Sequence, residues 1–352
     1  EAMVLNRAIQ RGLEFLDERQ SGAGHWEDFG ISGTSDKWTS AYVGSMLAEI
    51  NLPNSRRMAG SALAWLREVE AEGRWGYSEE APHDADTTTW VCRLADRLGQ
   101  GIGERTRAFL LEHLRPDGRL ATFDSSDFVE KFGRDRDRRG WYSGHLCVTA
   151  AAASLPDPLI RERTLQALVE SQCDDGSWDG YWWLDREYTT ALAIEAMVGE
   201  PVFESQRARA VKWLMSRVPP GTLIPTLHRP DGSPFASAFA VRGLAMAGKT
   251  DVVRSLARRL TEAQDREGGW IASAALRLPY PDVFVPDAEH WAPRDGGTIW
   301  DRPLWDQNAL HTTATVVNAL WHFSIRTGGT ALEASETDAL EAEPVPFLEQ
   351  EN

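Results

Sequence analysis

Two kinds of apolar segment alternate along the chain. Segments of the first kind carry charged side chains on one side of a helical repeat, as in residues 161–169, Arg-Glu-Arg-Thr-Leu-Gln-Ala-Leu-Val. A helix with this pattern lies at a surface, with its apolar stripe toward a core. Segments of the second kind are almost uncharged: residues 188–194 and 311–321 contain no acidic or basic side chain except His311. A helix that is apolar on every side is buried.

The two kinds of segment occur as six consecutive pairs. In each pair the amphipathic segment leads into a Gly-containing turn, often with Gln before it and Gly-x-Trp within it, and the uncharged segment opens on small and hydroxyl residues. The amphipathic segments lie at 13–16, 62–66, 109–114, 165–169, 210–215 and 256–260, and the uncharged ones open at 38–41, 87–90, 148–150, 188–191, 236–238 and 311–314. Six copies exceed the roughly three that a stacked helical array needs for stability.

This pattern predicts an all-α fold, a single (α/α)6 double-ring barrel of six helix-turn-helix repeats. Six buried helices would form the inner ring and six amphipathic helices the outer ring. No alternation of period two, which would indicate strands, is evident along the chain. We place the barrel domain at residues 1–330 and interpret residues 331–352 as an acidic C-terminal tail.

Two connections inside the repeats are unusually long. They span residues 122–144 and 271–308, and the second is rich in Pro and Trp. Loops of this length within a compact domain are typically lids or binding loops.

Composition excludes several function classes. The formal net charge of −16 argues against binding to nucleic acid or to an anionic membrane surface. No apolar run approaches the length of a membrane span, so we expect no transmembrane segment. Cys92, Cys147 and Cys173 follow neither a metal-binding spacing nor an even disulfide framework, which favours reduced thiols in a cytoplasmic protein. The sequence does not indicate an oligomeric state.

Acidic residues fall at two of the six inner-helix starts. When the uncharged segments are aligned on their openings, Asp86 and Glu187 occupy the same position. All six openings would lie at one end of the ring, so we expect both carboxyls to face the same mouth. The residues beside them are aromatic or imidazole: Trp38, Trp90, Tyr188, Phe235 and His311. The 15 Trp residues of the chain likewise suggest a large cavity or large contacts.

The pair Asp84 and Asp86 supports two interpretations. Asp and Thr before a helix are ordinary N-cap residues, whose side-chain oxygens accept from free backbone N–H groups. In an apolar cavity, however, a carboxyl is driven toward its neutral form, and two neighbouring carboxyls share a proton. Such a group can act as a proton donor.

These features together resemble a known family. The Gln-to-Trp turns, best preserved at residues 172–178 as Gln-Cys-Asp-Asp-Gly-Ser-Trp, resemble the QW repeats of squalene-hopene and oxidosqualene cyclases. Residues 84–88, Asp-Ala-Asp-Thr-Thr, are similar to the DxDD or DxDTT acid motif of class II terpene cyclases. The resemblance covers residues 5–325. Larger family members have two or three helical domains; this chain has one and so resembles monodomain sesquiterpene or meroterpenoid cyclases.

The resemblance implies a protonation-initiated cyclisation. The second Asp of the motif, Asp86, would be the general acid, and Asp84 would support it. Thr87 stands where the DxDD form has Asp, which favours the DxDTT branch and a farnesyl-length chain, either as a diphosphate or attached to an aromatic head. Asp86 would protonate a terminal alkene or epoxide of this linear isoprenoid, and the rings would close in sequence. The mechanism requires no cofactor, and Mg²⁺ would enter only with a diphosphate substrate.

Further candidates follow from the chemistry of cations. Each aromatic face near a cation contributes about 0.5–2 kcal/mol. The candidate rings are Trp38, Trp90, Tyr188, Phe235, Trp182, Trp183, Trp141, Trp300 and Trp305. His311 is a candidate to orient the acid or accept the final proton, and Glu187 is a candidate second carboxyl. Arg186 is one of several arginines suited to a diphosphate. No metal ligand set is predicted.

Two alternatives remain open. The β subunit of a protein prenyltransferase has the same barrel, and there His311 would be a zinc ligand. That site also needs an Asp-x-Cys pair, and residues 185–187, Asp-Arg-Glu, provide no thiolate. The other alternative is a non-catalytic lipid-binding α/α barrel, which would not need Asp86.

Overall fold

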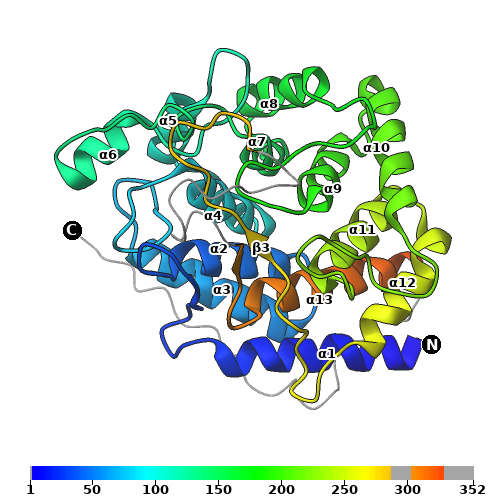
Figure 1. Cartoon of the computed structure of the whole chain (residues 1–352). Helices are drawn as coiled ribbons and strands as arrows, with labels where there is room; N and C mark the ends of the chain where they lie inside the picture. Colours follow the sequence, from blue (N-terminus) through cyan, green and yellow to red (C-terminus); the bar gives the residue numbers. More distant parts are fainter. Residues whose placement is uncertain (1, 287–302, 329–352) are drawn as a thin grey trace, which may run out of the picture.

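The chain forms two concentric rings of helices (Figure 1). The computed structural model describes residues 2–286 and 303–328. The inner ring consists of α2 (Lys37–Ala48), α4 (Ala85–Arg97), α7 (Leu146–Ala152), α9 (Arg186–Met197), α11 (Pro234–Met246) and α13 (Leu310–Arg326). The outer ring consists of α1 (Ala2–Arg19), α3 (Pro53–Glu68), α5 (Glu104–His113), α8 (Pro158–Glu170), α10 (Glu204–Arg217) and α12 (Thr250–Glu262).

The inner ring is closed. Each inner helix packs against the next in chain order, and α13 packs back against α2. The outer helices lie against the inner ones, with α1 contacting α12, α13 and α3. The predicted (α/α)6 barrel is therefore confirmed. The proposed tail, residues 331–352, lies outside the described residues.

Burial separates the two rings as the hydrophobic pattern predicted. Every residue of α2 is buried, and so is every residue of α11 except its last. In α12, by contrast, only Val253, Leu256, Ala257 and Leu260 are buried. An inner helix is surrounded by neighbours on all sides, whereas an outer helix buries a single stripe.

The remaining elements belong to the connections. Helix α6 (Ser125–Phe132) lies in the first long connection, and the short 3-10 helix η1 (Pro201–Phe203) precedes α10. Two antiparallel strand pairs also occur, β1 (Asp28–Gly30) with β2 (Thr34–Ser35) and β3 (Ala275–Leu276) with β4 (Leu304–Trp305). These strands leave no signal in the sequence, because two or three residues are too few to show an alternating pattern.

The repeated Trp residues fasten each turn to the outer helix before it, and the Gln of the motif reaches the next outer helix. The indole N–H groups of Trp26, Trp75, Trp178 and Trp270 donate to the carbonyls of Leu16, Leu66, Leu168 and Leu260, at 2.8, 2.6, 2.8 and 2.6 Å. Each acceptor is a carbonyl near the C-terminal end of an outer helix, where backbone partners are lacking or incomplete. The amide of Gln172 donates to Gly176 in its own turn and to the carbonyl of Gln206 in the next outer helix, both at 2.9 Å. The repeat motif therefore has a structural role.

Buried ion pairs hold the inner helices together at their C-terminal ends. Arg242 is 0% exposed and donates to Glu49 at 2.9 and 3.0 Å and to Glu195 at 2.8 Å. Arg93 also donates to Glu195, and His322 lies 2.7 Å from Glu49. Since these five residues come from α4, α9, α11, α13 and the end of α2, one network joins five of the six inner helices.

Candidate active site

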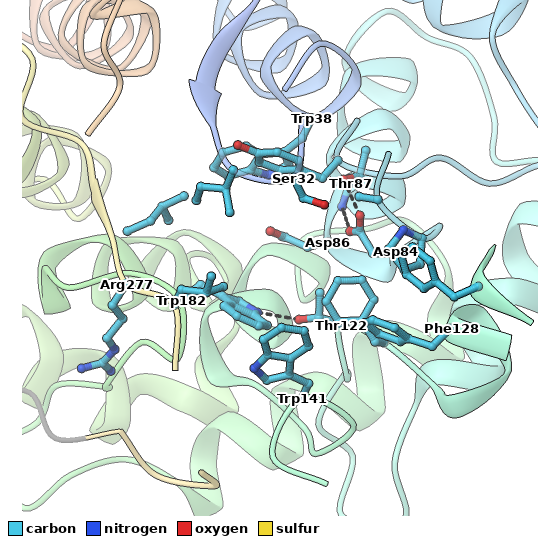
Figure 2. A pocket seen from close by; sticks show the side chains of 18 residues that line it. Ser32, Trp38, Asp84, Asp86, Thr87, Thr122, Phe128, Trp141, Trp182 and Arg277 are labelled. Carbon is cyan, nitrogen blue, oxygen red and sulfur yellow. Dashed lines mark hydrogen bonds between the residues drawn. The ribbon is translucent and has the colours of Figure 1, made fainter. Parts of the chain in front are cut away.

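A cavity of about 410 Å³ opens beside the first turns of α2 and α4 (Figure 2). Ser32 and Trp38 form one wall, and Asp84, Asp86 and Thr87 lie at the start of α4. Both long connections contribute to the wall, the first through residues 122–141 and the second through residues 276–278. The walls are mainly apolar, so the cavity suits a hydrocarbon ligand with few polar groups.

Asp84 is the N-cap residue of α4 and is fixed by Thr87. One carboxyl oxygen of Asp84 accepts from the backbone N–H of Thr87 at 2.6 Å, and the other accepts from its hydroxyl at 2.9 Å. The side chain is 2% exposed. The ordinary capping interpretation of the motif is thus correct for Asp84, and it does not exclude an additional role in the acid pair.

Asp86 lies two residues further, within the first turn of α4, and points into the cavity (Figure 2). Burial raises its pKa to about 7, although the indole N–H groups of Trp38 and Trp90 lower it. The pKa of Asp84 is raised to about 8, by burial first and then by the charge of Asp86, against the hydrogen bonds from Thr87. The helix N-terminus would stabilise a carboxylate here, so the raised values mean that desolvation outweighs it. Asp86 therefore holds a proton near neutral pH.

Three of the predicted aromatic residues line the cavity. Trp38, Trp141 and Trp182 all contribute to its wall. The indole N–H of Trp182 donates to the Thr122 hydroxyl at 2.7 Å, as Figure 2 shows. The rings of Trp141 and Trp182 lie 5.9 Å apart at 61°, so they present differently oriented faces to the same space.

Four other predicted rings pack in the interior of the barrel, outside the wall of the described cavity, so their contact with the substrate stays a prediction. Trp183 stacks on Tyr188 at 4.4 Å and on Phe235 at 5.0 Å, and Trp90 meets Tyr42 at 4.7 Å. Trp90, Tyr188 and Phe235 are 0% exposed and Trp183 is 1% exposed, and none of the four lines the described cavity. These rings come from α2, α4, α9, α11 and the connection before α9, and they pack against one another beneath the cavity.

His311 lies in this packed layer rather than in the cavity wall. Its ring stacks on Tyr42 at 4.5 Å and lies 4.6 Å from Trp38. Neither ring nitrogen has a hydrogen-bond partner within the described part of the chain. Burial lowers its pKa to about 3, so the imidazole is neutral. Its predicted role in orienting the acid or accepting the final proton remains a prediction.

Glu187 does not line the cavity that Asp86 enters, and it pairs with the outer ring. Its carboxylate accepts from the Arg217 guanidinium of α10 at 2.6 Å and is buried in that contact. The aligned positions are equivalent along the helices, but the side chain of Glu187 is directed to the outer ring, where a cation balances it.

Arg186 and Trp305 also lie elsewhere. The Arg186 guanidinium pairs with Asp175 at 3.1 Å and with Asp179 at 2.7 Å, so opposite charges at a repeat turn hold it. The Arg229 guanidinium covers the ring of Trp305 at 4.9 Å. Neither Arg186 nor Trp305 lines the described cavity, and Trp300 lies outside the described residues.

Several cavity residues were missed by sequence reasoning. They include Ile31, Ser32, Tyr77, Thr122, Phe123, Phe128, Arg277 and Leu278. All lie in connections between the ring helices, and Phe128 lies in the α6 helix of the first long connection. The length of the two long connections identified the segments of residues 122–128 and 277–278 but not the individual residues, whereas the shorter connections that hold residues 31, 32 and 77 gave no such signal.

No metal-ligand cluster and no membrane-spanning helix were found within the residues that the structure describes. No three His, Cys, Asp or Glu side chains among them are grouped as metal ligands. None of the described helices is both long and apolar enough to cross a membrane.

Comparison with known proteins gave both sequence and structural matches. No family model matches the chain. A curated squalene–hopene cyclase from Zymomonas mobilis is 22% identical over 348 residues, a match that covers 81% of this chain and 51% of that protein. The chain thus spans about half the length of the curated relative that it matches.

Solved structures match along most of the chain. A variant of the type II terpene cyclase MstE from Scytonema, in complex with geranylgeranyl dihydroxybenzoate as substrate, is 32% identical, with a TM-score of 0.85. That match covers 92% of this chain and 99% of the MstE chain. A crystal structure of a protein from Actinoplanes is 36% identical, with a TM-score of 0.84, over 91% of this chain and 99% of that one.

Proposed function

The chain belongs to the type II terpene cyclases, and we propose that its acid is Asp86, which protonates a linear polyprenyl substrate to start cyclisation. One observation carries this assignment: a carboxyl with a pKa raised to about 7 points into a cavity walled by apolar and aromatic side chains. In this scheme Asp84 and Thr87 fix the first turn of α4 and thereby hold Asp86 in position.

Protonation of an alkene requires a dry and neutral acid. The Asp86 O–H bond breaks, the proton forms a C–H bond at the terminal alkene carbon, and a tertiary cation remains on the substrate. Successive double bonds then attack the cation. Exclusion of water protects these cations, and the faces of Trp38, Trp141 and Trp182 are placed to stabilise them by about 0.5–2 kcal/mol each.

We propose that the substrate carries a farnesyl-length chain, because Thr87 gives the acid motif its DxDTT form. We propose that the prenyl chain occupies the cavity and that its head group lies toward the opening.

An aromatic head group is favoured over a diphosphate. MstE is bound to a prenylated dihydroxybenzoate, and Arg186, one of the arginines suited to a diphosphate, is held by Asp175 and Asp179 away from the cavity. Arg277 lines the cavity, but its guanidinium already donates to the carbonyls of Tyr181 and Gly180. Mg²⁺ would take part only with a diphosphate substrate. The prenyltransferase alternative is not supported, because His311 lies among aromatic rings rather than beside other metal ligands in the described structure.

A product assay tests this function. Purified protein is incubated with farnesylated and geranylgeranylated dihydroxybenzoate and with both prenyl diphosphates, each with and without Mg²⁺, and products are analysed by mass spectrometry. A cyclic isomer of unchanged mass supports the proposal, and the accepted substrate identifies chain length and head group. Release of diphosphate, or binding without turnover, would contradict it.

The rate is expected to fall as pH rises through the pKa of Asp86. The acid must carry its proton, and this pKa is about 7. Turnover should therefore be level below about pH 6 and decrease tenfold per pH unit above about pH 8. Initial rates between pH 5 and pH 9 provide the measurement, with the melting temperature recorded at each pH to exclude unfolding. A rate that increases toward pH 9 would rule out Asp86 as the acid.

A further inference from the structure

Two buried indole N–H groups near Asp86 have no acceptor. Within the described residues, Nε1 of Trp38 and Nε1 of Trp90 form no hydrogen bond. Both side chains are buried, at 3% and 0% exposure. The four repeat-turn Trp residues each donate to a helix carbonyl, so unpaired indoles are not general in this fold. An unsatisfied buried donor costs about 1–3 kcal/mol, and two at one place call for an explanation.

Both donors converge on the same carboxyl. Trp90 follows Asp86 by four residues in α4, so the two side chains share a helix face. Trp38 comes from the first turn of α2, which packs against α4, and it lines the cavity beside Asp86 (Figure 2). Both indole N–H groups lower the pKa of Asp86, although neither meets the geometry of a full hydrogen bond. The two indole N–H groups are thus close enough to interact electrostatically with the Asp86 carboxyl while it is still protonated.

A charged group supports one of the two indoles from behind. The Arg93 guanidinium lies 4.8 Å from the centroid of the Trp90 ring. Arg93 is itself held by two hydrogen bonds to Glu195 and one to the carbonyl of Ala151. A cation over an indole face withdraws electron density from the ring, which makes its N–H a stronger donor. Trp90 is therefore fixed and polarised while its N–H remains unused.

We propose that Trp38 and Trp90 act as a donor pair for the Asp86 carboxylate that forms when the proton leaves, an inference that rests on the acid role proposed above. When the O–H bond breaks, its electron pair stays on the carboxyl oxygens as negative charge. Donors aimed at a charge that develops during the reaction favour the transition state more than the ground state. Before proton transfer the two indole N–H groups have no hydrogen-bond acceptor, and after it they can donate to the Asp86 carboxylate.

This role differs from the one that the sequence suggested for these residues. Stabilisation of a substrate cation uses the face of an aromatic ring, whereas support of the acid uses the N–H edge of the indole. Phe retains a face and lacks the N–H. The sulfur analogue of Trp, 3-benzothienylalanine, retains nearly the whole ring shape and also lacks the N–H. These substitutions therefore separate the two roles.

The test compares Trp38→Phe, Trp90→Phe and benzothienylalanine at position 38 with the unmodified enzyme. Each is expected to lower kcat by about 100-fold, with KM within a few-fold of the original. Loss of a donor raises the pKa of Asp86, so the falling limb of the pH–rate profile should move to higher pH. Trp178→Phe is the matched control: it loses the hydrogen bond to Leu168 and should leave the limb in place.

A measurement that needs no substrate separates the test of the donor pair from the test of the proposed cyclase function. The protonated Asp86 carboxyl is titrated by infrared difference spectroscopy against Asp86→Asn, and its pKa should rise in both Trp→Phe variants. This readout applies even if no tested substrate is cyclised, an outcome that would count against the function alone. An unshifted Asp86 titration in folded Trp38→Phe and Trp90→Phe, or full activity of the benzothienylalanine enzyme, would overturn the donor role.

Discussion

Asp86→Asn is expected to lower turnover by about 10⁴-fold or more. General acid catalysis contributes about 10²–10⁴-fold where another proton source can substitute. In this cavity, apolar and aromatic side chains form most of the wall around Asp86, and no cation forms until a proton arrives. The loss should therefore lie at or beyond the upper end of that range. The measurement is cyclic product by mass spectrometry at equal protein concentration and pH 6.

The same variant should be more stable than the original at high pH. The folded-state pKa of Asp86 is raised to about 7 from 3.8, so the fold favours the protonated form. Stability is therefore lost as pH rises from about 4 to about 7 and stays low above that. Asn cannot ionise, so Asp86→Asn should melt higher than the original at pH 8, with the difference vanishing near pH 4.

A surface substitution controls for the loss of a carboxyl. Asp174 is exposed at a repeat turn, and Asp174→Asn should change neither activity nor the melting temperature noticeably. Retained cyclisation in Asp86→Asn would contradict the acid assignment, and circular dichroism and substrate binding establish that the variant compared is folded and binds.

Arg242→Met is expected to cost about 3–5 kcal/mol of unfolding free energy. Arg242 is 0% exposed and pairs with both Glu49 and Glu195. Removing one partner of a buried ion pair leaves desolvated charge uncompensated, and the cost of that exceeds the worth of the pair. The network joins five inner helices, so its loss should weaken the whole barrel in one cooperative transition. Urea unfolding followed by circular dichroism gives the free energy.

An exposed ion pair provides the matched comparison. Arg57 pairs with Asp17 at 2.6 Å, with side-chain exposures of 54% and 41%. Arg57→Met should cost no more than about 1 kcal/mol, because solvent screens exposed pairs. If Arg242→Met costs as little as Arg57→Met, the buried network does not hold the inner ring together.

The acid motif is the part of the site that the sequence predicted in most detail. The spacing of Asp84, Asp86 and Thr87 at the start of an uncharged segment predicted an acid pair at an inner-helix N-terminus. The structure places Asp84 as the cap and directs Asp86 into an apolar cavity. The first fact follows from local chemistry, because N-cap preference fixes the helix start.

The sequence did not determine which of the predicted aromatic residues line the cavity. Trp38 and Trp90 both stand near inner-helix starts, yet Trp38 lines the cavity and Trp90 packs beneath it. Along a helix that is apolar on every side, the sequence has no polar face to indicate which direction leads to the cavity. That direction depends on how each helix is rotated against its neighbours.

The sequence by itself determined the architecture, the chain's family and the place of the acid pair, because helical periodicity, repeat turns and N-caps are local properties. Only the tertiary structure decided what surrounds the acid. Residues 122–141 and 276–278 meet in one cavity wall although they are far apart in the chain, and Glu187 turns to Arg217 rather than to Asp86. Long-range packing and charge pairing set these contacts, and no local pattern encodes them.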